Sequence, residues 1–311
     1  MKKILISCIL SLLAVFPCQA EEYPNRPITV INGGPAGGLL DLPLRVACSM
    51  LSKEIGQPIV NTNITGGEGG VAINTALKAG HDGYTLMGLA ATYITFTPHY
   101  KKVRYGFDDF RILGAVADQR NGIMTQADRP WKDLNEAFEW AKKEDKRLIV
   151  GYVTGQDKYN IETCLKQANV KYSLVPQTGG AACLTGILGG HLDIATIGLL
   201  GVENTLAGKI KMLACSSVTR FTRLPEVPTL RELGYNIGQR DYVLLAGPAD
   251  MPEEAALVIE KALSKVVETE EYRAEVFGKI GMEPVSGNVE EIRSILTEIS
   301  NDMKEQLTQQ N

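Results

Sequence analysis

Histidine and cysteine are too few and too scattered in this chain to suggest a metal site. The 311 residues include three histidines and six cysteines. His81, His99 and His191 have no partner at ligand spacing, and no Cys-x-x-Cys pair occurs. Zinc sites need such clusters, so we expect no metal ion.

Signatures of nucleotide cofactors and of serine hydrolases are also missing. Neither G-x-G-x-x-G nor G-x-x-x-x-G-K-[ST] occurs, and no serine lies in G-x-S-x-G. A phosphate-cradling loop or a nucleophile elbow requires these spacings. We therefore expect no cofactor, no catalytic residues and no enzyme activity, with an exported hydrolase as an alternative.

The chain also lacks a basic excess and, beyond its first twenty residues, a long apolar run. It has 32 Lys and Arg against 36 Asp and Glu, a formal net charge of −4. Nucleic-acid-binding domains carry clustered positive charge, so we expect no nucleic-acid partner. A membrane-spanning helix needs about 20 apolar residues, so we expect none after residue 20.

The first twenty residues have the pattern of a cleavable export signal. Lys2 and Lys3 precede an apolar run over residues 4–16, and Cys18-Gln19-Ala20 suits a cleavage site. The run is too short to span a bilayer, so it favours a signal peptide over an anchor. We predict a signal peptide over residues 1–20 and a periplasmic mature protein that begins at Glu21.

Apolar runs of strand length alternate with helical patterns along the mature chain. The predicted strands are residues 28–31, 58–61, 84–89, 123–125, 148–152, 173–175, 194–197, 212–216 and 242–246. The predicted helices are residues 42–55, 71–79, 134–142, 161–167, 181–188, 253–267 and 289–306. This alternation predicts an α/β fold with mostly parallel sheets.

A glycine-rich turn connects the first predicted strand to the first predicted helix. Gly33-Gly34-Pro35-Ala36-Gly37-Gly38 leads into Leu39-Leu40-Asp41. Bare main-chain amides at a helix start favour an anion. Asp41 is also a candidate N-cap, with Pro43 in the first turn, and the two roles are compatible.

Three further features are less specific. Residues 65–70, Thr-Gly-Gly-Glu-Gly-Gly, form either a ligand loop or a flexible connection. Residues 153–158 follow the strand 148–152 as a second strand–loop–helix opening, in which Asp157 either contacts the ligand or, as we expect, is solvated. Cys164 and Cys183 lie on consecutive predicted helices, and the sequence leaves a disulfide between them open.

Six motifs in order give the chain a resemblance to a known family. Tyr23–Ile28 resembles the family's opening strand, and Gly37–Asp41 is similar to its GGxxD loop. The remaining motifs are Asn63–Gly70 for the second glycine loop, Asp82–Leu86 for DGYTL, Gly189–Asp193 for GGHxD and Leu224–Gly234 for LPxVPTxxExG. Together they resemble the periplasmic receptors of tripartite tricarboxylate transporters, called Bug or TctC-type receptors.

The resemblance implies a two-lobed periplasmic binding protein fold of type II, with two crossovers and a ligand cleft between the lobes. Residues 21–120 and 240–311 would form lobe 1, and residues 121–239 would form lobe 2. The ligand-binding positions that the motifs imply are Ala36, Gly37, Gly38, Leu39, Asp41, Thr65, Gly66, Ala91, Thr92, Thr154, Gly155, Gln156, Thr178, Gly179 and Gly180.

The chain departs from the family pattern after its GGHxD turn. The family often carries an Asp-Asn pair there, whereas this chain has Ile194-Ala195-Thr196-Ile197-Gly198-Leu199-Leu200. We therefore expect one wall of the cleft to be less polar than in the family.

The resemblance implies a receptor that closes its lobes on a small carboxylate and delivers it to the membrane components of a tripartite tricarboxylate-type transporter. The carboxylate would be a di- or tricarboxylate, an amino acid or an aromatic acid. We expect a monomer. An alternative is the same fold acting as a ligand sensor for a signalling partner.

Overall fold

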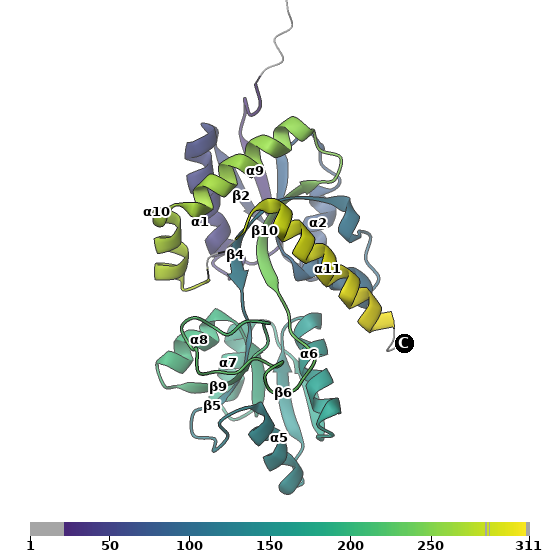
Figure 1. The fold of residues 1–311 in the computed structure, drawn as a ribbon, viewed down its shortest axis with the longest axis vertical. Helices are drawn as coiled ribbons and strands as arrows, with labels where there is room; N and C mark the ends of the chain where they lie inside the picture. The colour runs from purple at the N-terminus through teal and green to yellow at the C-terminus, as the bar shows by residue number, and fades with distance from the viewer. Residues whose placement is uncertain (1–21, 284, 286, 309–311) are drawn as a thin grey trace, which may run out of the picture.

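A computed structural model of the chain describes residues 22–283, 285 and 287–308. The predicted signal peptide, residues 1–20, lies outside these described residues. Two lobes stack along the long axis of the molecule, and each is built on a five-stranded sheet (Figure 1). Among the described helices, none is long and apolar enough to cross a bilayer.

The sheet of the first lobe has the order β2-β1-β3-β10-β4. Its strands are β1 (Ile28–Asn32), β2 (Ile59–Asn63), β3 (Thr85–Ala90), β4 (Phe110–Gln119) and β10 (Asp241–Pro248). Only β10 runs antiparallel to its neighbours. Helices α1 (Asp41–Ile55) and α9 (Glu253–Glu268) pack on one face, whereas α2 (Gly70–Ala76) and α11 (Val289–Thr308) pack on the other.

The sheet of the second lobe repeats this plan with the order β7-β6-β8-β5-β9. Its strands are β5 (Gly122–Gln126), β6 (Leu148–Tyr152), β7 (Tyr172–Pro176), β8 (Ile194–Ile197) and β9 (Ile210–Cys215), with β5 antiparallel. Helices α5 (Leu134–Lys143) and α6 (Gly155–Gln167) cover one face, and α7 (Gly180–Leu188) and α8 (Leu199–Leu206) cover the other.

The chain passes between the lobes twice. The first crossover joins β4 to β5, and the second joins β9 to β10 through residues 216–240. The predicted α/β fold with two crossovers and mostly parallel sheets is confirmed. The lobe boundaries at residues 120/121 and 239/240 stay a prediction.

Short helices complete the structure. In the first lobe they are α3 (Thr92–Thr95), α4 (Thr97–Tyr100), the 3₁₀ helix Phe107–Asp109, α10 (Glu270–Arg273) and the π-helix Ala274–Ile280. Helix α11 begins with a reciprocal cap, because Glu291 N–H donates to Asn288 Oδ1 and Asn288 N–H donates to Glu291 Oε2. Asn288 and Glu291 thus form a capping box, with the three-residue spacing that this motif requires.

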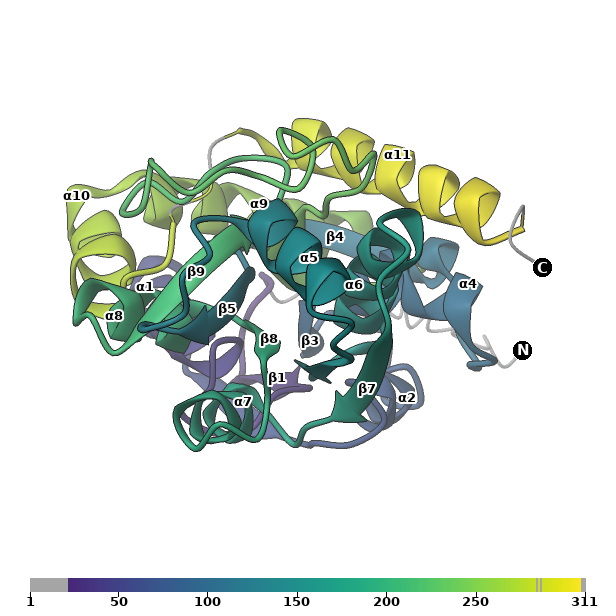
Figure 2. The same ribbon diagram turned by 90° about the horizontal axis from the view of Figure 1, so that it is seen from below.

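Helix α11 packs on both lobes. Ile292 and Leu296 belong to the core of the first lobe. Met303 and Leu307, three turns further along, are buried in the core of the second lobe. Helices α11 and α7 lie on opposite sides of the molecule when it is seen from below (Figure 2).

Several sequence predictions are wrong in detail. Strand β4 and helix α8 were not predicted, and α6 begins at Gly155 instead of residue 161.

The disulfide that the sequence left open is absent, because Cys164 and Cys183 are both free. Cys164 lies in the core that α6 covers and Cys183 in the core under α7, so the sheet separates the two thiols.

Candidate functional site

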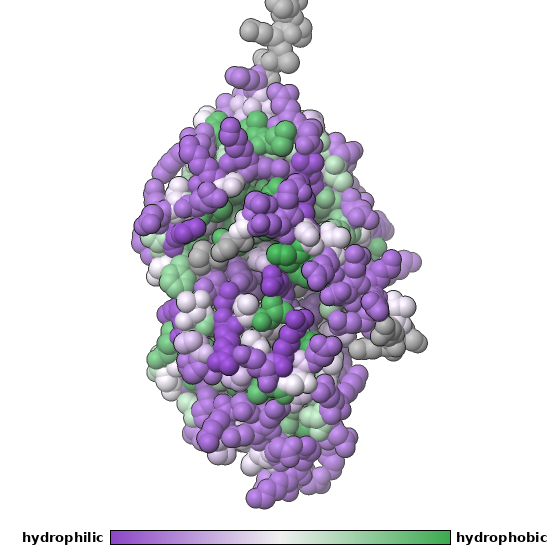
Figure 3. Space-filling model, in the orientation of Figure 1, coloured by the Kyte–Doolittle hydropathy of each residue, from purple (hydrophilic) through white to green (hydrophobic). Residues whose placement is uncertain are grey.

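A cavity of about 590 Å³ lies between the two lobes, lined by residues from both. Leucines and other apolar side chains make up much of its wall, including Leu39, Leu199 and Leu200. The face shown in Figure 3 is instead largely hydrophilic, with scattered apolar residues. A cavity of this size accommodates a small organic molecule, so this cleft is the candidate site.

The glycine loop of the first lobe forms one wall of the cleft. The lining residues include Gly34, Pro35, Gly37, Gly38 and Leu39. Gly37 has a φ of +73°, a backbone conformation that residues other than glycine rarely adopt. The loop therefore presents main chain together with the side chains of Pro35 and Leu39 to the ligand space.

Asp41 holds this loop from beneath. Its buried carboxylate accepts hydrogen bonds from Gly37 N–H at 2.8 Å, Arg45 Nε at 2.6 Å, Asn32 Nδ2 at 3.0 Å and Asn63 Nδ2 at 2.9 Å. Burial alone would raise the pKa of Asp41, but the donors outweigh it and the pKa lies below its usual range.

The structure corrects the predicted N-cap role of Asp41. Leu40 occupies the N-cap position of α1 and Asp41 is the first helical residue. Its side chain accepts from the loop behind it and leaves the N–H groups of its own helix without a side-chain cap. Asp41 is therefore a buried anchor of the loop, outside the cleft lining.

The opposite wall comes from helix starts in the second lobe. Thr154 caps α6, because Asp157 N–H donates to Thr154 Oγ1 and Thr154 N–H donates to Asp157 Oδ2. Asp157 is 3% exposed, so the prediction that it is solvated is wrong. Burial raises the pKa of Asp157, although its bonds from Thr154 and Asn121 act against this.

Helices α7 and α8 also begin at the cleft. Gly179 and Gly180 line it at the start of α7, and Gly198 and Leu199 line it at the start of α8. The N-terminal ends of α6, α7 and α8 place bare amides and positive dipole ends near one space. Such an arrangement stabilises a carboxylate without a cationic side chain.

The predicted ligand-binding residues divide into two sets. Gly37, Gly38, Leu39, Thr92, Thr154, Gln156, Gly179 and Gly180 line the cleft. Ala36, Asp41, Thr65, Gly66, Ala91, Gly155 and Thr178 do not, although most of them are chain neighbours of residues that do. The roles of all fifteen residues in ligand binding stay predictions.

The second glycine loop acts on the cleft through Tyr93. A Cβ built on Gly69 would lie 2.3 Å from two ring carbons of Tyr93, and one on Gly33 would lie 3.4 Å from the same ring. Tyr93 lines the cleft, so the second glycine loop packs against a residue of the cleft wall. Thr65 and Gly66, which lie in the same loop, are not part of the lining.

Sequence reasoning missed the cleft residues at the crossovers. Gln119 and Asn121 lie at the first crossover, Gln239 and Asp241 at the second, and all four line the cleft. A polar chain joins Gln156 through Asn160 to Gln239, with both hydrogen bonds at 2.9 Å. These residues lie next to the lobe boundaries predicted at residues 120/121 and 239/240. Those boundaries were the one feature of the sequence analysis from which the four residues could have been predicted.

The wall at the start of α8 is apolar, as the departure from the family pattern led us to expect, whereas Glu203 further along the helix adds a carboxylate to the lining. Ile197, Leu199 and Leu200 line the cleft there. Leu39 reaches across from the first lobe, and its Cδ1 lies 2.7 Å from a Cβ built on Gly198. Glycine at position 198 therefore permits a close apolar contact between the lobes.

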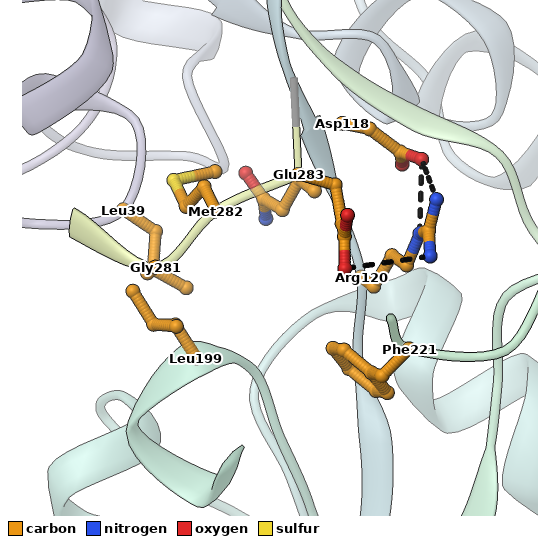
Figure 4. A pocket seen from close by; sticks show the side chains of 9 residues that line it. Leu39, Asp118, Arg120, Leu199, Phe221, Gly281, Met282 and Glu283 are labelled. Atoms are coloured by element: carbon orange, nitrogen blue, oxygen red, sulfur yellow. Dashed lines mark hydrogen bonds and ion pairs between the residues drawn. The ribbon is translucent and has the colours of Figure 1, made fainter. Parts of the chain in front are cut away.

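A charged cluster lies at the hinge beside this contact (Figure 4). Arg120 Nη2 lies 2.7 Å from Asp118 Oδ2, and Arg120 Nη1 lies 3.7 Å from Glu283 Oε1. Glu283 also accepts hydrogen bonds from Thr222 N–H at 2.9 Å and Thr222 Oγ1 at 2.8 Å. Burial raises the pKa of Asp118 against the opposing charge of Arg120.

The cavity within this hinge cluster measures only about 10 Å³. Such a volume holds about one water molecule, so it is no ligand site. Within the part of the chain that the structure describes, no group of three or more His, Cys, Asp or Glu side chains is arranged to hold a metal ion.

Comparison with known proteins places this geometry in a family. The family model described as "Tripartite tricarboxylate transporter family receptor" (TctC) matches residues 44–311. The chain belongs to this receptor family. The resemblance that the six sequence motifs indicated is thereby confirmed.

Relatives and solved structures agree with the assignment. The UPF0065 protein in the gbd 5′ region of Cupriavidus necator is 29% identical over 92% of this chain and 88% of its own length. A TctC solute-binding protein from Polaromonas, crystallised without ligand, is 25% identical over 93% of this chain and 100% of its own, with a TM-score of 0.75. MatC from Rhodopseudomonas palustris, solved with bound malate, is 21% identical over 92% of this chain and 100% of its own, with a TM-score of 0.78.

The fold of this TctC receptor is thus the two-lobed fold of solute-binding proteins. Its family is one of receptors, not of enzymes. The crossovers, the glycine loop and the helix starts together frame a single cleft in which a solute can contact both lobes.

Proposed function

We propose that this TctC receptor captures a small carboxylate in the periplasm and delivers it to a tripartite tricarboxylate-type membrane transporter. The carrying observation is the cleft, in which the glycine loop of one lobe faces the starts of α6, α7 and α8 from the other. Main-chain amides and helix dipoles favour a carboxylate there. Bound malate in MatC is consistent with this ligand class.

Binding works by closure of the lobes around the ligand. A ligand that contacts both walls interacts more favourably with the closed state, so binding shifts the population toward closure. Each amide contact that is lost and leaves a buried group unpaired costs about 1–3 kcal/mol. The export signal predicted at residues 1–20 supports the periplasmic location.

A thermal-shift screen tests the binding proposal. Di- and tricarboxylates, amino acids and aromatic acids are added to the mature protein, and a specific ligand should raise Tm in a dose-dependent way. Failure of all four classes to raise Tm would refute the proposal.

A matched pair of glycine variants locates the binding. A Cβ at Gly179, in the cleft lining, and one at Gly106, outside it, both meet no atom within 4 Å. Gly179→Leu should therefore fold normally but abolish the ligand-induced rise in Tm, whereas Gly106→Leu should preserve it. A full ligand response in Gly179→Leu contradicts the assignment of this cleft.

Delivery is tested in cells by deleting the gene and following two responses to the identified ligand. The proposal expects loss of uptake with intact induction of ligand-responsive genes. Normal uptake with lost induction would instead support the sensor alternative.

A further inference from the structure

The cleft is acidic, although the family's name and the malate-bound neighbour point to anionic ligands. Among the described residues that line it, none is Lys, Arg or His, and two, Glu203 and Asp241, carry carboxylates. Glu203 is already paired with Arg223. Asp241 is 3% exposed and takes part in no ion pair among the described residues.

The hydrogen bonds of Asp241 come from a single residue. Thr92 N–H donates to Asp241 Oδ1 at 3.1 Å, and Thr92 Oγ1 lies 3.5 Å from Asp241 Oδ2. One carboxylate oxygen therefore has only a weak partner. A buried carboxylate usually requires a full set of donors or a cation, because its desolvation is costly.

The charged groups around Asp241 do not supply that cation. Asp157 at the start of α6 and Asp118 on β4 both add negative charge, and Tyr93 on α3 is neutral. Burial first, and then these two acids, raises the pKa of Asp241 to about 7. Near neutral pH the carboxyl is therefore poised between its neutral form and a form that needs a positive partner.

Gln119 provides a second acceptor at the same place. Its Oε1 is buried and has no hydrogen-bond partner among the described residues. Gln119 pairs with Asp241 across β4 and β10, and both residues line the cleft. Directly paired residues of antiparallel strands point to one face with Cβ atoms about 5 Å apart, so the two side chains start side by side at the cleft.

We propose that Asp241 and Gln119 bind the ammonium group of a zwitterionic ligand, an amino acid with an apolar side chain. This proposal rests on the proposed function, which supplies the ligand's carboxylate and its contact with the helix starts. An ammonium group carries three N–H donors, enough for Asp241 Oδ2, Gln119 Oε1 and one further acceptor. The apolar wall of Leu39, Ile197 and Leu199 accommodates the side chain.

Calorimetric titration of matched ligands tests the proposal. Leucine and phenylalanine are compared with 4-methylpentanoate and 3-phenylpropanoate, which keep the carboxylate and side chain but lack the ammonium, and with malate and adipate. A hydrogen bond to a charged group is worth about 1.5–3 kcal/mol, so the amino acids should bind about 10-fold tighter or more than their deaminated counterparts.

The variant Asp241→Asn should remove this preference by weakening amino-acid binding about 10-fold, with little effect on the deaminated acids. The control Asp145→Asn changes an exposed carboxylate in the second lobe and should leave the preference intact. If Asp241→Asn does not fold, the pH dependence of the native protein decides. Amino-acid affinity should rise between pH 6 and pH 8, because only ionised Asp241 pairs with an ammonium group.

Two results separate this inference from the function on which it rests. Deaminated acids or dicarboxylates that bind as tightly as amino acids, or that bind less tightly as pH rises through 7, would overturn the role of Asp241 and leave the receptor proposal standing. The second pattern would mean that neutral Asp241 donates to a ligand carboxylate. Absence of binding by every acid would overturn both.

Discussion

Removal of the charge on Asp41 should destabilise the first lobe and weaken ligand binding together. In Asp41→Asn, the amide oxygen can replace only one of the two carboxylate oxygens. Oδ2 accepts from Gly37 and Arg45, and Oδ1 accepts from Asn32 and Asn63. The new NH₂ group therefore faces two donors whichever way the amide is oriented.

The neighbouring amides cannot easily turn to accept from that NH₂ group. Asn32 Oδ1 already accepts from Gly34 N–H, and Asn63 Oδ1 already accepts from Arg45 Nη2. Two hydrogen bonds to a buried side chain are lost, at about 1–3 kcal/mol each, so Asp41→Asn should lower the free energy of unfolding by about 2–6 kcal/mol.

Urea denaturation followed by circular dichroism measures this loss. The pKa of Asp41 is lowered by folding, so its contribution is complete above the unfolded value of 3.8 and is lost as pH falls through the folded pKa. The penalty should therefore be constant from pH 5 to pH 8 and shrink in stronger acid. Asp145→Asn, at an exposed ion pair, serves as control and should have no measurable effect. An unchanged midpoint in Asp41→Asn would refute the anchoring role.

Three further predictions concern other parts of the site. Gly69→Ala should reduce ligand affinity, since its Cβ would displace Tyr93. The control Gly67→Ala also changes a residue with a positive φ but has an open Cβ position, so it should lower Tm and leave ligand affinity unchanged. Equal losses of affinity in calorimetry would contradict this. Glu283→Ala should lower the free energy of unfolding in urea by about 1–3 kcal/mol for each of the two hydrogen bonds across the hinge, because Thr222 N–H and Thr222 Oγ1 both lose their acceptor; an unchanged midpoint would argue against that contact. Asp241→Asn should raise Tm of the ligand-free protein more at pH 8 than at pH 5, because burial raises the pKa from 3.8 to about 7 and stability is lost progressively as pH rises from 3.8 through that value; an equal effect at both pH values would exclude the ionised form as the cause.

Local patterns in the sequence were sufficient for most of the fold. The strand before the first glycine loop and the helix over residues 289–306 were predicted because hydrophobic periodicity is local. Strand β4 was missed because Gly114, Ala115 and Ala117 weaken its strand pattern. Its ten residues are extended because β10 pairs with them, with two register shifts along the way. This pairing joins segments more than a hundred residues apart, so no local pattern reports it.

The same distinction applies to the cleft. The glycine loops were visible because a ligand site made of main-chain amides requires glycine at neighbouring positions. The crossover residues Gln119, Gln239 and Asp241 were not visible, because they lie in the cleft only where strands leave one sheet for the other. The predicted lobe boundaries came within one residue of these positions, yet gave no chemical reason to select them.

Asp41 and Asp241 illustrate why the remaining chemistry depends on the folded structure. Both are buried carboxylates in one lobe, and burial alone would raise the pKa of each. Asp41 collects four donors, including an arginine, and its pKa falls. Asp241 has donors from Thr92 alone, with two acids nearby, and its pKa rises to about 7. Three of the four Asp41 donors lie within nine residues of it in sequence, whereas Thr92 is 149 residues from Asp241. The structural anchor was therefore partly encoded in local sequence, but the residue that we infer to select the ligand acquires its properties only when the second crossover brings β10 between β3 and β4.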